Sequence, residues 1–146
     1  MKNFFKFLIY LLPWFLSSLI FKVDKVFYSS INKPFFAPPP IVFAIVWPIL
    51  YVLIAYSLYK NKNKNMCYYK SLIINYFSNQ IYTFLFFTVK SPFIAFVDTV
   101  IVFISSLFLY YESKELNKTS AKLLIPYIIW NVFATILIIS IFFMNL

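Results

Sequence analysis

Residues 41–59 read IVFAIVWPILYVLIAYSLY and contain no charged side chain. The hydrocarbon core of a bilayer is about 30 Å thick, and roughly 20 helical residues cross it. This run is therefore long enough to span a membrane as one helix. Pro40 directly before it suits the first helical turn, where no backbone N–H is needed. We predict a transmembrane helix over residues 41–59.

Four further apolar segments of similar length take up most of the chain, at residues 4–21, 67–89, 93–111 and 120–144. The 146 residues are 63% hydrophobic and only 12% charged, whereas soluble domains are about half apolar and a quarter charged. No alternation typical of strands competes with these runs. The sequence predicts an all-α fold, with residues 1–146 forming one transmembrane domain, a bundle of five helices.

The first segment has two interpretations. Lys2 and Lys6 before a short apolar run are typical of a signal peptide, with Ser17 and Ser18 as small residues near a cleavage point. However, Pro13 interrupts the run, and there is no clear cleavage motif of small residues. We therefore expect a retained helix with a kink at Pro13.

The connection over residues 22–40 is long for two packed helices, and loops of this length are usually functional or disordered. Its second half reads NKPFFAPPP over residues 32–40. Prolines fix φ and favour an extended chain before them, so a stiff, polyproline-like strip is expected. It is either a lid over the bundle or an anchor at the membrane interface. The residues of this candidate lid are Lys33, Pro34, Phe35, Phe36, Pro38 and Pro39.

All thirteen basic residues are lysines, and they lie at the ends of the apolar segments and in the loops. That placement favours anionic lipid headgroups as partners rather than nucleic acid. Nine lysines fall on the side of the N-terminus and four on the other side. The positive-inside rule then predicts a cytoplasmic N-terminus and a C-terminus outside.

Polar side chains inside the third and fourth segments are the first functional candidates. Asn75, Ser78, Asn79 and Tyr82 follow each other at helical spacing, so they share one face. Such a face must meet other helices or a cavity. Asp98 is the only acidic residue well inside an apolar segment, and we consider both a structural and a ligand-binding role for it.

Aromatic faces on the second and fifth segments are further candidates. Trp47 and Tyr51 share a face with Ala44, and Trp130 shares one with Ala134 and Leu137. Ordinary helix packing explains such faces as well as a binding site does. The chain has no histidine and a single cysteine, so it offers no nucleophile–base pair and no cluster of metal ligands. We expect no metal site and no conventional enzyme activity.

Four motifs follow one another over about residues 28–145: Asn32-Lys33-Pro34 with Pro38-Pro39, Val42-Phe43, Trp47 and Leu50-Tyr51; Asn79 with Phe86-Phe87; Ala95-Phe96-Val97-Asp98; and Leu124-Ile125-Pro126-Tyr127 with Trp130, Phe133-Ala134-Thr135 and Leu137. In this order and spacing they resemble the motifs of the TspO/MBR family, the tryptophan-rich sensory or translocator proteins.

The resemblance implies a five-helix bundle, usually a homodimer, in a bacterial cell membrane. It also implies that no cofactor is required and that a hydrophobic ligand, most typically a protoporphyrin IX-type tetrapyrrole, binds beneath the loop between the first two helices. The pocket residues it implies are Ala44, Trp47, Tyr51, Asn79, Tyr82, Trp130, Phe133, Ala134 and Leu137, and Asp98 joins these candidates because it is an acidic residue inside a span. Lys33 is expected to meet a propionate.

Two departures from the family pattern bear on activity. The tryptophan of the family's proline-rich motif is Ile41 here, and a second aromatic of the fifth helix is Ile139. Light-dependent porphyrin breakdown is associated in the family with pocket tryptophans, here Trp47 and Trp130, so these two departures count against it. It is kept as an alternative to binding. Sterol or lipid transport is another alternative. Without histidine, the commonest haem-iron ligand is missing, which favours metal-free porphyrin.

Overall fold

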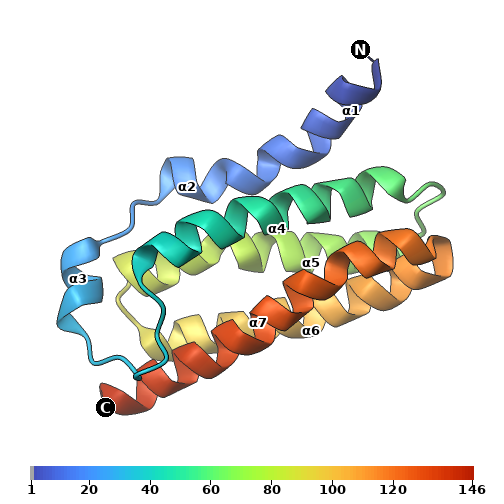
Figure 1. Ribbon diagram of the computed structural model, residues 1–146. Coiled ribbons are helices and arrows are strands. Elements are labelled where there is room, and N and C mark those ends of the chain that lie inside the picture. The colour runs from blue at the N-terminus through green and yellow to red at the C-terminus, as the bar shows by residue number, and fades with distance from the viewer. Residues whose placement is uncertain (1) are drawn as a thin grey trace.

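The computed structural model describes residues 2–146 and shows long helices packed side by side, with the two termini at opposite ends of the bundle (Figure 1). The first span consists of α1 (Lys2–Leu11), the 3₁₀ turn η1 (Leu12–Phe15) and α2 (Leu16–Ile20). The helix breaks where it was expected to, because Pro13 has no N–H and the chain tightens into a 3₁₀ turn around it.

The connection to the second span differs in part from the expected strip. It contains a short helix, α3 (Lys25–Ser30), which begins at Asp24. The Asp24 carboxylate accepts a hydrogen bond from the Phe27 amide at 2.9 Å, as an N-cap does. An extended segment over residues 31–39 follows, with a turn at Phe35 and Phe36.

The second and third spans follow the predicted ranges closely. Helix α4 covers Pro40–Lys60, and α5 covers Met66–Thr83 and continues into a π-helical turn, η2 (Phe84–Thr88). The turn between α4 and α5 needs a left-handed residue, which Asn63 supplies with φ of 54°. Asparagine tolerates this conformation well, and this chain has no glycine to take the position.

The boundary between the last two spans corrects the sequence prediction. Residues 112–119 were expected to form a charged connection, but α6 runs from Pro92 to Leu116 and α7 from Lys118 to Met144. Asn117 alone separates them, and its side chain accepts hydrogen bonds from the Thr119 and Ser120 amides. Charged residues favour helix as readily as loop once the helix has left the hydrocarbon, so charge marks the membrane boundary here and not the helix end.

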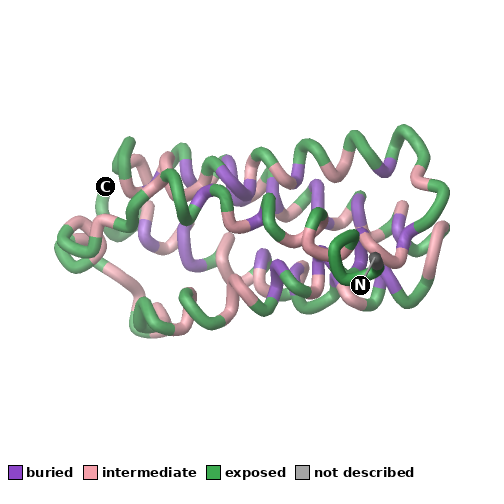
Figure 2. The backbone as a smooth tube through the Cα atoms, turned by 90° about the horizontal axis from the view of Figure 1, so that it is seen from above, coloured by how far each residue is buried: buried purple, intermediate pink, exposed green. Residues whose placement is uncertain are grey.

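The helices form one bundle in which α6 packs against α5 and α7, α7 also packs against α4, and the first span lies along α4 and α5. Buried positions lie toward the inside of the bundle and exposed positions toward its outside (Figure 2). The exposed side chains include isoleucine, leucine and phenylalanine. Among the described residues, four helical segments are long and apolar enough to cross a membrane: Asn3–Ile20, Pro40–Lys60, Pro92–Leu116 and Lys118–Met144. The fifth crossing, α5 with η2, is more polar because it carries the asparagines and the glutamine of the interior. The protein is an integral membrane bundle of five spans.

Candidate functional site

A buried polar network crosses the centre of the bundle and is built on α5. The Tyr51 hydroxyl of α4 donates to Asn79 Oδ1 at 3.3 Å, and Asn79 Nδ2 donates to the Tyr127 hydroxyl of α7 at 3.2 Å. That hydroxyl in turn donates to Asn75 Oδ1 at 3.1 Å. Asn75 Nδ2 donates to the Ser105 hydroxyl of α6 at 3.0 Å. The polar stripe expected on the third span therefore faces the interior and joins it to three other spans.

Gln80 extends the network to the first span. Its amide Oε1 accepts from the Ser17 backbone N–H at 2.8 Å, and Nε2 donates to the Trp14 backbone carbonyl at 3.2 Å. Both backbone groups lie at the break around Pro13. Gln80 thus supplies hydrogen-bond partners to two backbone groups whose regular helical bonds the 3₁₀ turn disturbs. Lipid has no groups that could pair with them.

An aromatic chain lies between α4 and α7, directly beside this network. The Trp47 ring centre is 5.6 Å from that of Tyr51 and 6.4 Å from that of Trp130. Trp130 is 5.2 Å from Phe133, which is 6.3 Å from Phe36 of the 31–39 segment. Ring contacts therefore run without interruption from the loop to the middle of the bundle. We call these five residues and Phe43, which lies 5.8 Å from Trp130, the aromatic chain.

The other predicted site residues differ in how far they are buried. Leu137 is buried, Ala134 is half-buried, and Ala44 is exposed on the outer side of α4. Tyr82 is half-buried and stacks on Phe86 with ring centres 5.9 Å apart. Their positions are thus known, whereas their role in binding stays a prediction.

Asp98 is buried in α6 and faces the Ser78 side of α5. Its Oδ2 has no hydrogen-bond partner among the described residues. The same holds for Trp130 Nε1 in the aromatic chain. Buried polar atoms are usually paired, so each of these two atoms has unused capacity for a hydrogen bond.

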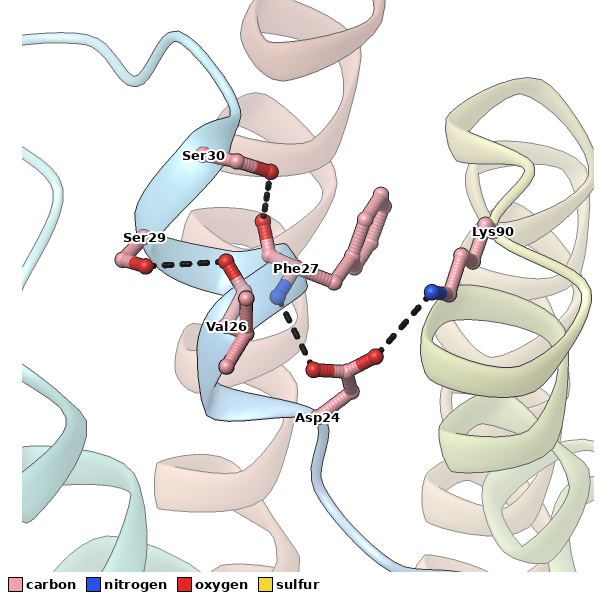
Figure 3. Close-up of polar contacts among 6 residues, drawn as sticks. All are labelled: Asp24, Val26, Phe27, Ser29, Ser30 and Lys90. Carbon is pink, nitrogen blue, oxygen red and sulfur yellow. Dashed lines mark hydrogen bonds and ion pairs between the residues drawn. The ribbon is translucent and has the colours of Figure 1, made fainter.

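The loop over residues 22–39 is fastened to the bundle at two points. At its start, the Asp24 carboxylate lies 3.1 Å from the Lys90 ammonium in the turn between η2 and α6 (Figure 3). Lys90 holds φ of 56°, a strained value for a lysine. The Phe27 amide and then Lys90 hold the pKa of Asp24 below its usual value.

At its far end, the loop is fastened by Asn145, just after α7. The Asn145 side chain accepts from the Asn32 N–H at 2.9 Å and donates to the Asn32 carbonyl at 2.8 Å. The Asn32 side chain adds a donation to the Met144 carbonyl at 3.2 Å. We call these three hydrogen bonds the asparagine latch. No sequence pattern singled out Asn145, because a polar residue after the last span looks like an ordinary interface residue.

The candidate lid residues divide into two groups. Phe36 contacts the bundle through the Phe133 ring. The Pro38 carbonyl accepts a hydrogen bond of 3.5 Å from the Tyr28 hydroxyl of α3, within the loop itself. Phe35 is fully exposed. Lys33 does not extend freely over the interior, because its ammonium donates to the carbonyls of Tyr28 and Ile31 at 2.6 and 2.9 Å and so caps the end of α3.

Two hollows lie on the outer sides of the bundle and not in the aromatic chain. One, of about 340 Å³, is lined by Asn3, Phe4, Phe7, Tyr56 and Tyr59. The other, of about 200 Å³, lies between α5 and α6. Rings of the aromatic chain contact one another along the space between α4 and α7. Among the described residues, no three His, Cys, Asp or Glu side chains gather as metal ligands.

Comparison with known proteins gives a consistent result over nearly the whole chain. The sequence model of the TspO/MBR family matches residues 6–144. The chain is 37% identical over 136 residues to the tryptophan-rich protein TspO of Bacillus cereus, covering 90% of this chain and 89% of that protein. It is 33% identical over 133 residues to the uncharacterized membrane protein YtaB of Bacillus subtilis, covering 87% and 85%. A tryptophan-rich protein TspO of Archaeoglobus fulgidus is 28% identical over 133 residues, covering 83% and 81%.

Proposed function

The chain belongs to the TspO/MBR family, and from that premise we propose that it is a membrane receptor for a flat hydrophobic ligand of the protoporphyrin IX type. The observation that carries the proposal is the aromatic chain between α4 and α7, which ends beneath the loop at Phe36. Stacked and edge-on rings suit a planar aromatic plate, and burial of its faces supplies most of the affinity.

We propose that binding in this place involves rearrangement of side chains, since the rings of the aromatic chain contact one another there. Trp47, Trp130 and Phe133 are half-buried at the edge of the core, and we propose that their rings turn aside to admit the ligand. Trp130 Nε1, which has no partner, would then be free to donate to a polar edge of the ligand. The loop carrying Phe36 would close over it.

The test is a titration of protoporphyrin IX into the protein in lipid nanodiscs, followed by quenching of tryptophan fluorescence. Phe133→Ala removes one ring contact on each side and is expected to weaken binding roughly tenfold. Phe108→Ala is the matched control, because Phe108 is exposed on α6 outside the aromatic chain. Equal affinities of the two variants would contradict the proposal.

Light-dependent breakdown of the bound porphyrin is a second candidate, because Trp47 and Trp130 lie edge to face with ring centres 6.4 Å apart. Under illumination, loss of porphyrin absorbance is followed in the wild type and in Trp47→Phe. A reaction that needs the tryptophan stops in the variant while most of the affinity is kept. Unchanged kinetics would leave only photochemistry sensitised by the ligand itself.

The proposal includes an orientation in the membrane and an oligomeric state. The nine lysines at the end of α4 and neighbouring segments favour a cytoplasmic N-terminus, and the C-terminus lies at the opposite end of the bundle (Figure 1). Pairing of two copies into a homodimer stays a prediction from the family, and size-exclusion chromatography with light scattering in detergent tests it.

A further inference from the structure

The larger hollow lies between α1 and α4, at the lysine-rich end of the bundle. Its walls are Asn3, Phe4 and Phe7 from α1 and Tyr56 and Tyr59 from α4, around a volume of about 340 Å³. Its open side faces outward, since Asn3, Phe4 and Tyr56 are exposed there. An occupant therefore enters from the plane of the membrane and not from the interior of the bundle.

The walls are apolar, aromatic and ordered by mutual contacts. Phe7 meets the Tyr56 ring edge-on with centres 6.3 Å apart. Tyr56 and Tyr59 lie nearly parallel, with centres also 6.3 Å apart and planes 12° from each other. Tyr56 and Tyr59 lie one helical turn apart, and Phe7 lies across the hollow from them. The narrow slot between these rings suits the start of an acyl chain better than a broad planar ligand such as a porphyrin.

A cation stands at the edge of this slot. Lys60 Nζ lies 5.2 Å from the Tyr56 ring centre, at the last residue of α4. Lys62 and Lys64 follow in the next turn, and the sequence has no acidic residue from 25 to 97. A negative group at this edge therefore meets positive charge without a competing carboxylate on either wall.

We propose that the hollow between α1 and α4 is a binding site for one anionic phospholipid, with its phosphate at Lys60 and the beginning of an acyl chain between Phe7 and Tyr56. The site is separate from the aromatic chain between α4 and α7, so it stands whether or not the protein binds porphyrin. Lysine near a lipid surface contributes about 1 kcal/mol to the binding of anionic lipid, which corresponds to about fivefold in affinity.

Native mass spectrometry of the detergent-purified protein tests the site. The protein is titrated with dioleoyl phosphatidylglycerol and, separately, with dioleoyl phosphatidylcholine, and the first bound lipid is counted. We expect the anionic lipid to bind about fivefold more tightly and Lys60→Gln to abolish most of that preference. Asn3→Trp, which fills the hollow and keeps the lysine, is expected to weaken binding of both lipids.

Lys118→Gln is the matched control. The hydroxyls of Ser57 on α4 and Ser120 on α7 are 2.7 Å apart. Lys60 and Lys118 lie within one turn of this contact on the same side of it, so the two lysines have a similar depth in the membrane. Lys118 is exposed and does not adjoin the hollow. Equal binding of the two lipids by the wild type, or an equal loss in Lys118→Gln and Lys60→Gln, would overturn the proposal.

Discussion

Replacing Gln80 by leucine tests the interior most directly. Leucine has nearly the size of glutamine but offers neither donor nor acceptor. Gln80 is buried, and its amide serves the Ser17 N–H and the Trp14 carbonyl in the interrupted first span. After the substitution, both backbone groups lie in a dry place without this partner.

The size of the effect follows from those two contacts. A buried polar group left without a partner costs about 1–3 kcal/mol. Hydrogen bonds between helices in a membrane protein are worth less, about 0.6 kcal/mol on average and at most about 1.7. Two backbone groups are affected here, and the 3₁₀ turn prevents them from pairing as in a regular helix. We expect Gln80→Leu to lower the free energy of unfolding by about 2–3 kcal/mol.

The free energy of unfolding is measured by steric trapping in bicelles, so that the protein stays in a lipid environment. Tyr76→Phe is the comparison, because the Tyr76 hydroxyl also donates to the broken segment, at the Pro13 carbonyl and 2.9 Å away. That contact is exposed, and the Leu16 amide already donates to the same carbonyl. Its loss is expected to cost less than about 1 kcal/mol.

A second substitution identifies the cause. In a regular helix the Ser17 N–H would donate to the carbonyl of residue 13, and Pro13 is what tightens the chain instead. Pro13→Ala should therefore restore part of the stability lost in Gln80→Leu. A loss below about 0.5 kcal/mol in Gln80→Leu, or no recovery in the double variant, would refute the idea that Gln80 repairs the proline break.

Three further outcomes are expected. Asn145→Ala removes two of the three hydrogen bonds of the asparagine latch and should speed hydrogen exchange in residues 31–39 roughly tenfold, whereas Leu146→Ala should not. Asp24→Asn should lower the melting temperature at neutral pH. Because the pKa of Asp24 is held below 3.8 in the folded protein, the stability that it adds is fully present above 3.8 and is lost as pH falls through the lowered pKa, so the difference from wild type should shrink over that range. Metal-free protoporphyrin should bind more tightly than haem, since no histidine is present, and a Soret shift showing axial ligation with tighter haem binding would contradict this.

The five spans could be predicted from the sequence because lipid leaves few choices. A segment that crosses hydrocarbon must be helical and mostly apolar, so the run at 41–59 predicted α4 almost to the residue. The break at Pro13 was equally open to prediction, because it follows from one missing N–H. The prediction of a loop over the charged residues 112–116 was wrong, because water solvates charged side chains on a helix as well as on a loop.

The partners of the polar side chains could not be predicted in the same way. The spacing of Asn75 and Asn79 showed that they share a face, but not that Tyr127 lies between them in space. Gln80 was missed because it stands next to the stripe and reaches a neighbouring helix with a long side chain. Lys33 is expected to meet a propionate. In the structure its ammonium donates to carbonyls at the end of α3, which lie nearer. Contacts of this kind depend on how helices pack, which sequence periodicity does not contain.

Tyr51 connects the network to the aromatic chain. Its hydroxyl donates to Asn79, while its ring lies between Trp47 at 5.6 Å and Trp14 at 5.8 Å. If a ligand displaces the Trp47 ring, Tyr51 must keep its hydrogen bond at a changed ring position or release Asn79. Asn79 also receives a hydrogen bond from Gln80, which holds the first span at its break. A change at Tyr51 would therefore reach the first span at that break. The contacts among Tyr51, Asn79 and Gln80 thus link the aromatic chain to the first span, and the loop that follows this span carries Phe36 to the aromatic chain.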